Sequence, residues 1–168
     1  DDRAIERCRE RLAPYGAAST VIKTNYSELA QVLDALEIEA INGILWDLGV
    51  SSVQLDEAER GFSYSCDAPL DMRMDRSGGR TAADIVNTYS EDELRRVIRD
   101  WGEEAFASRI AAAIVEKRCS APIETTSQLA DIVASAIPAA ARRKEKQHPA
   151  KRTFQAIRIE VNDELTII

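Results

Sequence analysis

Apolar residues recur at helical spacing in the first third of the chain and alternate there with short continuous apolar runs. One helical stripe lies within residues 3–12 and a second within residues 27–36. Residues 19–23 and 41–47 read as short strands, the second of which contains the apolar run at residues 44–46. The order helix, strand, helix, strand at these short spacings predicts a parallel α/β sheet.

After about residue 78 the pattern becomes helical throughout. Two pairs, Thr81 with Asp84 and Ser90 with Glu93, are typical of the capping boxes that begin helices. Apolar stripes continue at helical spacing, and residues 150–165 form one long amphipathic pattern. The sequence therefore predicts three parts: a partial α/β core over residues 1–77, an inserted all-helical unit over 78–147, and a return helix of the core over 148–168.

The two predicted strands are too few for an independent sheet. A parallel sheet needs cover on both faces and more than two strands to be stable. The chain also starts inside a helical pattern, and no strand pattern follows its last helix. We therefore expect the sequence to be a piece of a larger fold.

Composition narrows the class of protein. The chain has 168 residues, of which 45% are hydrophobic and 30% charged, as in ordinary globular domains. No apolar run approaches the roughly 18 residues that a membrane span needs, so we expect no membrane segment. The three cysteines are odd in number and far apart, which argues against a disulfide framework and a zinc site. These features favour a cytoplasmic protein.

The net charge of −7 makes the chain a poor general binder of nucleic acid. Between Arg142 and Arg152, however, six basic residues accompany a single acid. Such a local run can contact phosphates even when the whole chain is acidic. The alternative is a solvated linker.

The strongest signal of chemistry follows the second apolar run. This run meets one carboxylate, Asp47, and then breaks at Gly49 into small polar residues. The loop continues with Gln54, Asp71 and Arg73, and few of its residues could build a core. A buried strand that ends in an acid and a glycine loop is how an α/β sheet presents a site at its carboxyl edge.

Several motifs together resemble one known family, the MraW (RsmH) family. The motifs are DLGVSSVQLD at residues 47–56, ERGFS at 59–63, PLDMRMD at 69–75, GEE at 102–104, and HPAKRTFQAIRI at 148–159 with VNDEL at 161–165. They occur in the order and at the spacing of the family and span nearly all of the chain. The family's glycine-rich cofactor loop and its last strands have no counterpart in this sequence.

The resemblance implies an S-adenosylmethionine-dependent methyltransferase acting on the exocyclic amine of a cytidine in small-subunit ribosomal RNA. The implied fold is a partial Rossmann-like core with an inserted helical domain. The implied partner is the small ribosomal subunit, and homodimerisation is left open. Because the cofactor loop is lacking, we expect the isolated chain to be inactive.

By the same resemblance, Asp47 would serve catalysis and the cofactor, while Tyr26 and Gln54 would contact the cofactor. An acid at this place can accept hydrogen bonds from the amine of the target base. The structural alternatives are a loop-capping carboxylate for Asp47, simple packing for Tyr26, and a surface amide for Gln54.

RNA contacts are expected from Asp71, Arg73, His148, Lys151 and Arg152. The alternative for Asp71 and Arg73 is a loop braced by its own salt bridges, which requires partial burial, since exposed pairs add little to stability. A different function also stays open. The chain would then be a non-enzymatic helical module that binds RNA or protein and carries relic α/β elements.

Overall fold

The computed structural model describes residues 2–144 and 147–165, so that part of the basic run and the last three residues of the predicted return segment lie outside it. Within the described residues the regular structure is helical, and no strand forms. One isolated antiparallel bridge joins Pro69 to Thr125. The α-helices are α1 (Asp2–Leu12), α2 (Leu29–Ala35), α3 (Ser52–Asp56), α4 (Ala82–Thr88), α5 (Glu91–Asp100), α6 (Ala107–Arg118), α7 (Thr126–Ala136), α8 (Ala139–Arg142) and α9 (Lys151–Asn162).

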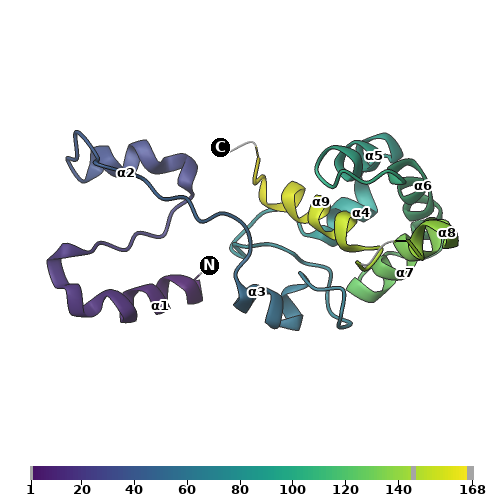
Figure 1. The fold of residues 1–168 in the computed structure, drawn as a ribbon, viewed down its shortest axis with the longest axis horizontal. Helices are drawn as coiled ribbons and strands as arrows, with labels where there is room; N and C mark the ends of the chain where they lie inside the picture. The colour runs from purple at the N-terminus through teal and green to yellow at the C-terminus, as the bar shows by residue number, and fades with distance from the viewer. Residues whose placement is uncertain (1, 145–146, 166–168) are drawn as a thin grey trace.

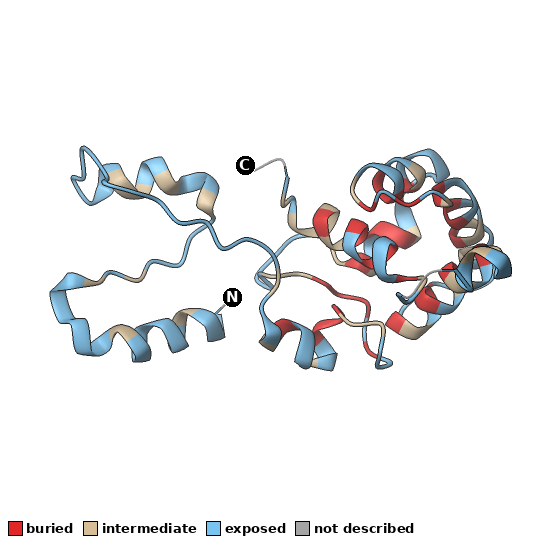
Figure 2. Cartoon of the chain, in the orientation of Figure 1, coloured by how far each residue is buried: buried red, intermediate tan, exposed pale blue. Residues whose placement is uncertain are grey.

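Burial divides the chain into two unequal regions. Helices α1 and α2 lie apart from the others on long irregular segments (Figure 1). No described residue before Gln54 is buried, and the buried positions gather among α4 to α9 and the loops beside them (Figure 2). The apolar faces of α1 and α2 therefore gain little from contact with the rest of the chain.

The predicted strands do not form. Residues 19–23 and 41–47 have irregular backbone, so the expected α/β sheet is wrong for this chain as described. A strand is stabilised by hydrogen bonds to a neighbouring strand, and neither segment has one here. The apolar side chains of the second segment remain in solvent, with Leu45 92% exposed and Ile44 and Trp46 about half exposed. An inserted domain also presupposes a sheet core, and the described residues contain none.

The helical predictions, in contrast, are confirmed. Residues 3–12 all lie in α1, which begins one residue earlier, and residues 27–36 and 150–165 contain α2 and α9. Capping boxes begin α4 and α5 at Thr81 and Ser90, as predicted, and two further boxes begin α3 and α7. Each box gives two backbone N–H groups a side-chain partner, which fixes where the helix starts.

One hydrophobic core joins α4, α5, α6, α7 and α9. Its centre consists of large aliphatic side chains that are completely buried, among them Ile85, Leu94, Ile98, Ile110, Ile114, Leu129 and Ile157. Phe62, Leu70 and Met72, from the loop before α4, belong to the same core. That loop is therefore anchored on the helices.

Among the described residues, no helix combines the length and apolarity that crossing a bilayer requires.

A single carboxylate on α9 links three parts of the helical region. Glu160 accepts hydrogen bonds from the Tyr89 hydroxyl at 3.0 Å and from the Trp101 indole Nε1 at 2.7 Å. Its Oε1 also lies 3.3 Å from Nη2 of Arg96. The Glu160 side chain is only 15% exposed. Water therefore has little access to these donors and could not easily take the place of the carboxylate as their acceptor. Glu160 therefore holds α9 against α5 and the end of α4.

Replacing Glu160 by alanine should lower the free energy of unfolding by about 1–3 kcal/mol, because the Trp101 and Tyr89 donors lose their acceptor. Chemical denaturation followed by circular dichroism measures the change. Glu116→Ala, on the exposed side of α6, is the matched control and should change stability by less than about 0.5 kcal/mol. Equal effects of the two substitutions would show that the Glu160 contacts do not stabilise the fold.

Candidate functional site

A cavity of about 340 Å³ brings together two of the predicted site residues, Tyr26 and Asp47. Three separate stretches of the chain and the end of α9 form its wall. The lining residues are Tyr26, Trp46, Asp47, Leu48, Gly49, Met74, Arg158, Ile159, Glu164 and Leu165. We call it the Tyr26–Asp47 cavity. A larger hollow of about 480 Å³ lies on residues of α6 and α7, but it contains none of the predicted residues.

Aromatic rings form one side of the Tyr26–Asp47 cavity. The rings of Tyr26 and Trp46 meet edge to face, with centroids 5.7 Å apart. The Tyr26 hydroxyl donates a hydrogen bond to the Glu164 carbonyl at 3.2 Å. Burial raises the pKa of the Tyr26 phenol above its ordinary value, and the charge of Glu164 adds to the rise. Tyr26 therefore stays a neutral hydrogen-bond donor at physiological pH.

An ion pair at the end of α9 forms another part of the wall. Nε and Nη2 of Arg158 donate to the two carboxylate oxygens of Glu164 at 2.8 and 3.0 Å. The side chains are 22% and 13% exposed, respectively. A fork-to-carboxylate contact of this kind fixes the plane of the guanidinium. Sequence reasoning assigned no role to this pair, because a spacing of six residues across a helix end gives no regular signal.

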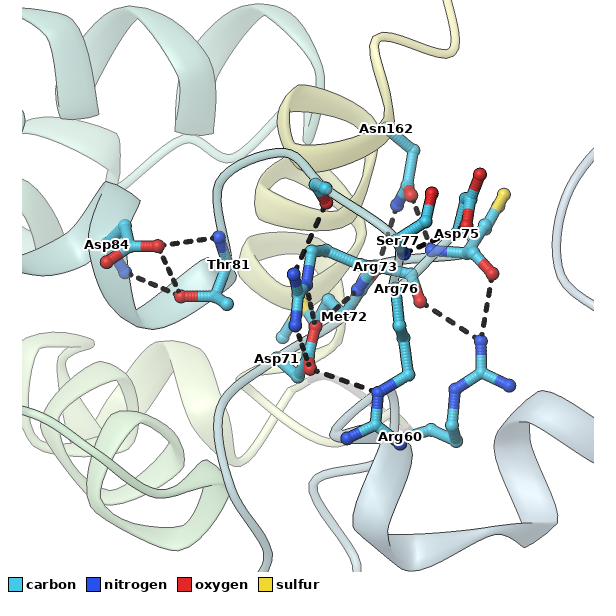
Figure 3. Close-up of polar contacts among 12 residues, drawn as sticks. Arg60, Asp71, Met72, Arg73, Asp75, Arg76, Ser77, Thr81, Asp84 and Asn162 are labelled. Atoms are coloured by element: carbon cyan, nitrogen blue, oxygen red, sulfur yellow. Dashed lines mark hydrogen bonds and ion pairs between the residues drawn. The ribbon is translucent and has the colours of Figure 1, made fainter. Parts of the chain in front are cut away.

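Asn162, in the last turn of α9, holds the loop that precedes α4. Its Nδ2 donates to the carbonyls of Met72 at 2.8 Å and Arg158 at 2.9 Å, and its Oδ1 accepts the Met74 N–H at 2.7 Å (Figure 3). Met72 is completely buried and has a positive φ of 61°, a conformation that a side chain rarely adopts without support. The contacts of Asn162 therefore fix Met74 in the cavity wall.

The same loop is held from its other side by Arg60. Nη2 of Arg60 donates to the carbonyls of Arg73 at 3.0 Å and Met74 at 3.1 Å. The next residue, Gly61, has a φ of 71°, and its Cα faces the backbone of Pro69 and Asp71. Arg60, which is buried, and Asn162, which is partly buried, thus hold one short segment between them.

Asp71 and Arg73 form an ion pair inside this loop. Oδ1 of Asp71 accepts from Nε of Arg73 at 2.7 Å, and Oδ2 accepts from Nη2 at 3.0 Å (Figure 3). Burial alone would raise the pKa of Asp71, but the hydrogen bonds from Arg73 and the charges of Arg73 and Arg76 outweigh it and hold that pKa below its usual value. Asp71 is 7% exposed, which is the burial that the structural alternative requires. A contact between Arg73 and RNA stays a prediction.

Gln54 lies outside the lining of the Tyr26–Asp47 cavity. Its side chain is buried and belongs to the capping box of α3, where Oε1 accepts the Ser51 N–H at 2.8 Å. The box explains its burial by local structure. Its predicted contact with a cofactor remains untested.

The residues predicted to contact RNA near the start of α9 lie away from the cavity. His148 is exposed, and its ring stacks on Tyr64 with centroids 4.5 Å apart. Lys151 and Arg152 are exposed in the first turn of α9, and Arg152 donates to the Glu103 carbonyl at 3.3 Å. The cavity begins at Arg158, seven residues further along this helix than Lys151 and about 11 Å along its axis. The structure does not bring these three residues together with Asp47.

Comparison with known proteins gives a consistent result. Residues 1–168 match the model of the MraW methylase family. The protein named Ribosomal RNA small subunit methyltransferase H from Thermobifida fusca (strain YX) is 61% identical over 168 residues, which are 100% of this chain and 51% of that protein. Proteins of the same name are 56% identical in Pseudarthrobacter chlorophenolicus and 58% in Symbiobacterium thermophilum, over 100% and 98% of this chain and 51% and 52% of theirs.

The chain thus spans about half the length of the curated relatives it matches. The match to the family model runs over every residue of the sequence, and it includes the loops and the helix end that form the Tyr26–Asp47 cavity. The chain belongs to the MraW methylase family.

Proposed function

We propose that this chain is part of a methyltransferase that uses S-adenosylmethionine to methylate the exocyclic amine of a cytidine in small-subunit ribosomal RNA. The observation that carries the proposal is the Tyr26–Asp47 cavity, which combines two aromatic rings with a carboxylate. Family membership and the names of the relatives support the same reaction.

The residues of the cavity suit such a reaction. The rings of Tyr26 and Trp46 offer flat apolar surface to an adenine, as aromatic side chains commonly do. Gln54, which lies outside the lining of this cavity, would contribute a further cofactor contact. S-adenosylmethionine, when bound, supplies a methyl group on a positively charged sulfur. None of these roles needs a metal ligand or a histidine base.

Asp47 acts on the target amine. Its carboxylate accepts a hydrogen bond from the amine and aims the nitrogen lone pair at the methyl carbon. Bound S-adenosylmethionine would supply the methyl group and retain its sulfur as a neutral thioether, and Asp47 or water would accept the proton that the amine loses. A displacement of this kind depends mainly on position, to which the held parts of the wall, Met74 and Arg158, contribute.

In the whole protein, the segments 19–23 and 41–47 become strands of a Rossmann-like core. The support is their exposed apolar side chains, Ile22, Ile41, Ile44, Leu45 and Trp46, which a neighbouring layer would cover. Residues 78–147 then form a helical insertion, and residues 148–168 return to the core. In this arrangement the isolated chain binds the cofactor weakly or not at all.

Arg73, His148, Lys151 and Arg152 contact the RNA, and Asp71 orients Arg73. The lysine and arginines would meet phosphates, whereas exposed His148 could also meet a base. A cytidine must leave its stack for its amine to reach the cavity, so a flipped or looped-out base is expected. Action on ribosomal subunits places the protein in the cytoplasm. A homodimer remains a prediction.

A methyl-transfer assay on isolated small ribosomal subunits tests the proposal. The whole protein, with S-adenosylmethionine labelled in its methyl group, should place label in RNA that digests to N4-methylcytidine. Large subunits serve as the control and should take up little label. Label in another nucleoside would contradict the proposed substrate. RNA binding without transfer would favour the alternative, a non-enzymatic interaction module.

A further inference from the structure

Two polar groups of opposite charge line the Tyr26–Asp47 cavity, and each has an atom without a partner among the described residues. Among the described residues, the Asp47 carboxylate accepts no hydrogen bond, and Nη1 of Arg158 donates none. Arg158 uses only Nε and Nη2 in its contact with Glu164. The cavity therefore offers one carboxylate acceptor and one guanidinium donor to whatever it binds.

The guanidinium of Arg158 is held in a fixed orientation. Glu164 grips it by two hydrogen bonds, Tyr26 holds the Glu164 carbonyl, and Asn162 holds the Arg158 carbonyl. A side chain held this way loses little further freedom when its remaining N–H groups bind a ligand. Glu164 also offsets the positive charge, which makes a neutral ligand more suitable than a phosphate.

We propose that Arg158 recognises the target base by donating from Nη1 to N3 of cytosine while Asp47 accepts from the amine. This inference rests on the proposed function. Cytosine presents an amine donor beside the N3 acceptor on its pairing edge, and the cavity wall contains both a carboxylate and a guanidinium that could face them. The cavity of about 340 Å³ falls within the usual range of about 300–1,000 Å³ for small-ligand sites.

The same arrangement rejects uracil. Uracil places a carbonyl oxygen where the amine would be, opposite the Asp47 carboxylate, and an N–H at position 3, opposite the Arg158 donor. Both contacts would then pair like with like. Polar groups that lose their partners discriminate between substrates, and most strongly where they are shielded from water, as Arg158 is at 22% exposure. Arg158 is thus a specificity residue.

The experiment combines a protein variant with a substrate analogue. The whole protein and its Arg158→Gln and Arg158→Lys variants are assayed on RNA that carries cytidine or 3-deazacytidine at the methylated position. Because a hydrogen bond from a charged donor is removed, Arg158→Gln should lower kcat/KM on cytidine about 10- to 100-fold. Arg158→Lys keeps the charge near Glu164, so its kcat/KM should lie between those of the unsubstituted protein and of Arg158→Gln. The matched control is Arg99→Gln, on exposed Arg99, which pairs with its neighbour Asp100 and should change little.

The analogue separates recognition from folding. Replacing cytidine by 3-deazacytidine should lower kcat/KM of the unsubstituted protein by a similar factor. The same replacement should lower kcat/KM of the Arg158→Gln variant little further, because that variant has already lost the hydrogen bond to N3. Independent, multiplying effects would overturn the inference, as would full activity of the unsubstituted protein on 3-deazacytidine, a result that needs no variant to fold. If the unsubstituted protein methylates no cytidine at all, the proposed function itself fails.

Discussion

Substitution of Asp47 by asparagine should lower kcat for methyl transfer to small ribosomal subunits by about 100-fold or more, while the affinity for the RNA stays nearly unchanged. The exchange keeps the size of the side chain but removes the charge that orients the amine and receives its proton. Losing a positioned acid–base group typically costs a factor of about 10²–10⁴. Asp47 is exposed in an irregular loop, so the fold should tolerate the change. Steady-state kinetics with the whole protein measures the effect.

Two comparisons make the Asp47 result specific. Asp34→Asn, on an exposed residue of α2, removes the same charge outside the cavity and should leave kcat within about twofold. Calorimetry with S-adenosylmethionine separates a loss of cofactor affinity from a loss of chemistry. An Asp47→Asn protein with normal kcat would remove Asp47 from the reaction and return it to the role of a loop carboxylate.

Substitution of Gly61 by alanine should lower the free energy of unfolding by about 2–5 kcal/mol. A Cβ at this position would lie 2.3 Å from the Pro69 carbonyl oxygen and 2.8 Å from the Asp71 nitrogen, and backbone atoms cannot move aside cheaply. Overpacking costs about 1–3 kcal/mol, and a left-handed conformation adds about 1–2 kcal/mol for a residue with a side chain. Denaturant titration measures the sum.

Two other glycines separate these contributions. Gly79 also has a positive φ, of 80°, but a Cβ added there would meet no atom within 4 Å, so Gly79→Ala should show the conformational part alone. Gly43 has open space and no positive φ, so Gly43→Ala should be close to neutral. An equal loss of stability for Gly61→Ala and Gly79→Ala would mean that the close approach of Pro69 does not matter.

The sequence predicted the helices well because helix signals are local. Thr81 with Asp84 and Ser90 with Glu93 lie three residues apart, and each pair closes its capping box within one turn. The predicted strands at residues 19–23 and 41–47 do not form, because a strand, unlike a helix, depends on contacts that are not local. An apolar run shows that a segment can become a strand, but the partner that supplies its hydrogen bonds must come from elsewhere in the fold.

The site was only partly predictable. The family motifs pointed to Tyr26 and Asp47, which line one cavity. Arg158 and Asn162, in contrast, were not chosen, although both belong to a quoted motif. Asn162 matters through its contact with Met72, 90 residues away, and Arg158 pairs with Glu164 across the irregular end of α9. No periodic pattern in one sequence records a contact of that range.

The hydrogen bonds by which Asn162 holds the backbone of Met72 and Met74 have a consequence for biosynthesis. A ribosome adds about 5–20 residues per second, so Met72 and Met74 leave it several seconds before Asn162 arrives to hold them. A nascent chain in that interval carries Tyr26 and Asp47 but lacks Arg158, Glu164 and the fixed Met74. The Tyr26–Asp47 cavity is therefore completed only when α9 emerges from the ribosome, and a truncated product that ends before α9 would lack this cavity.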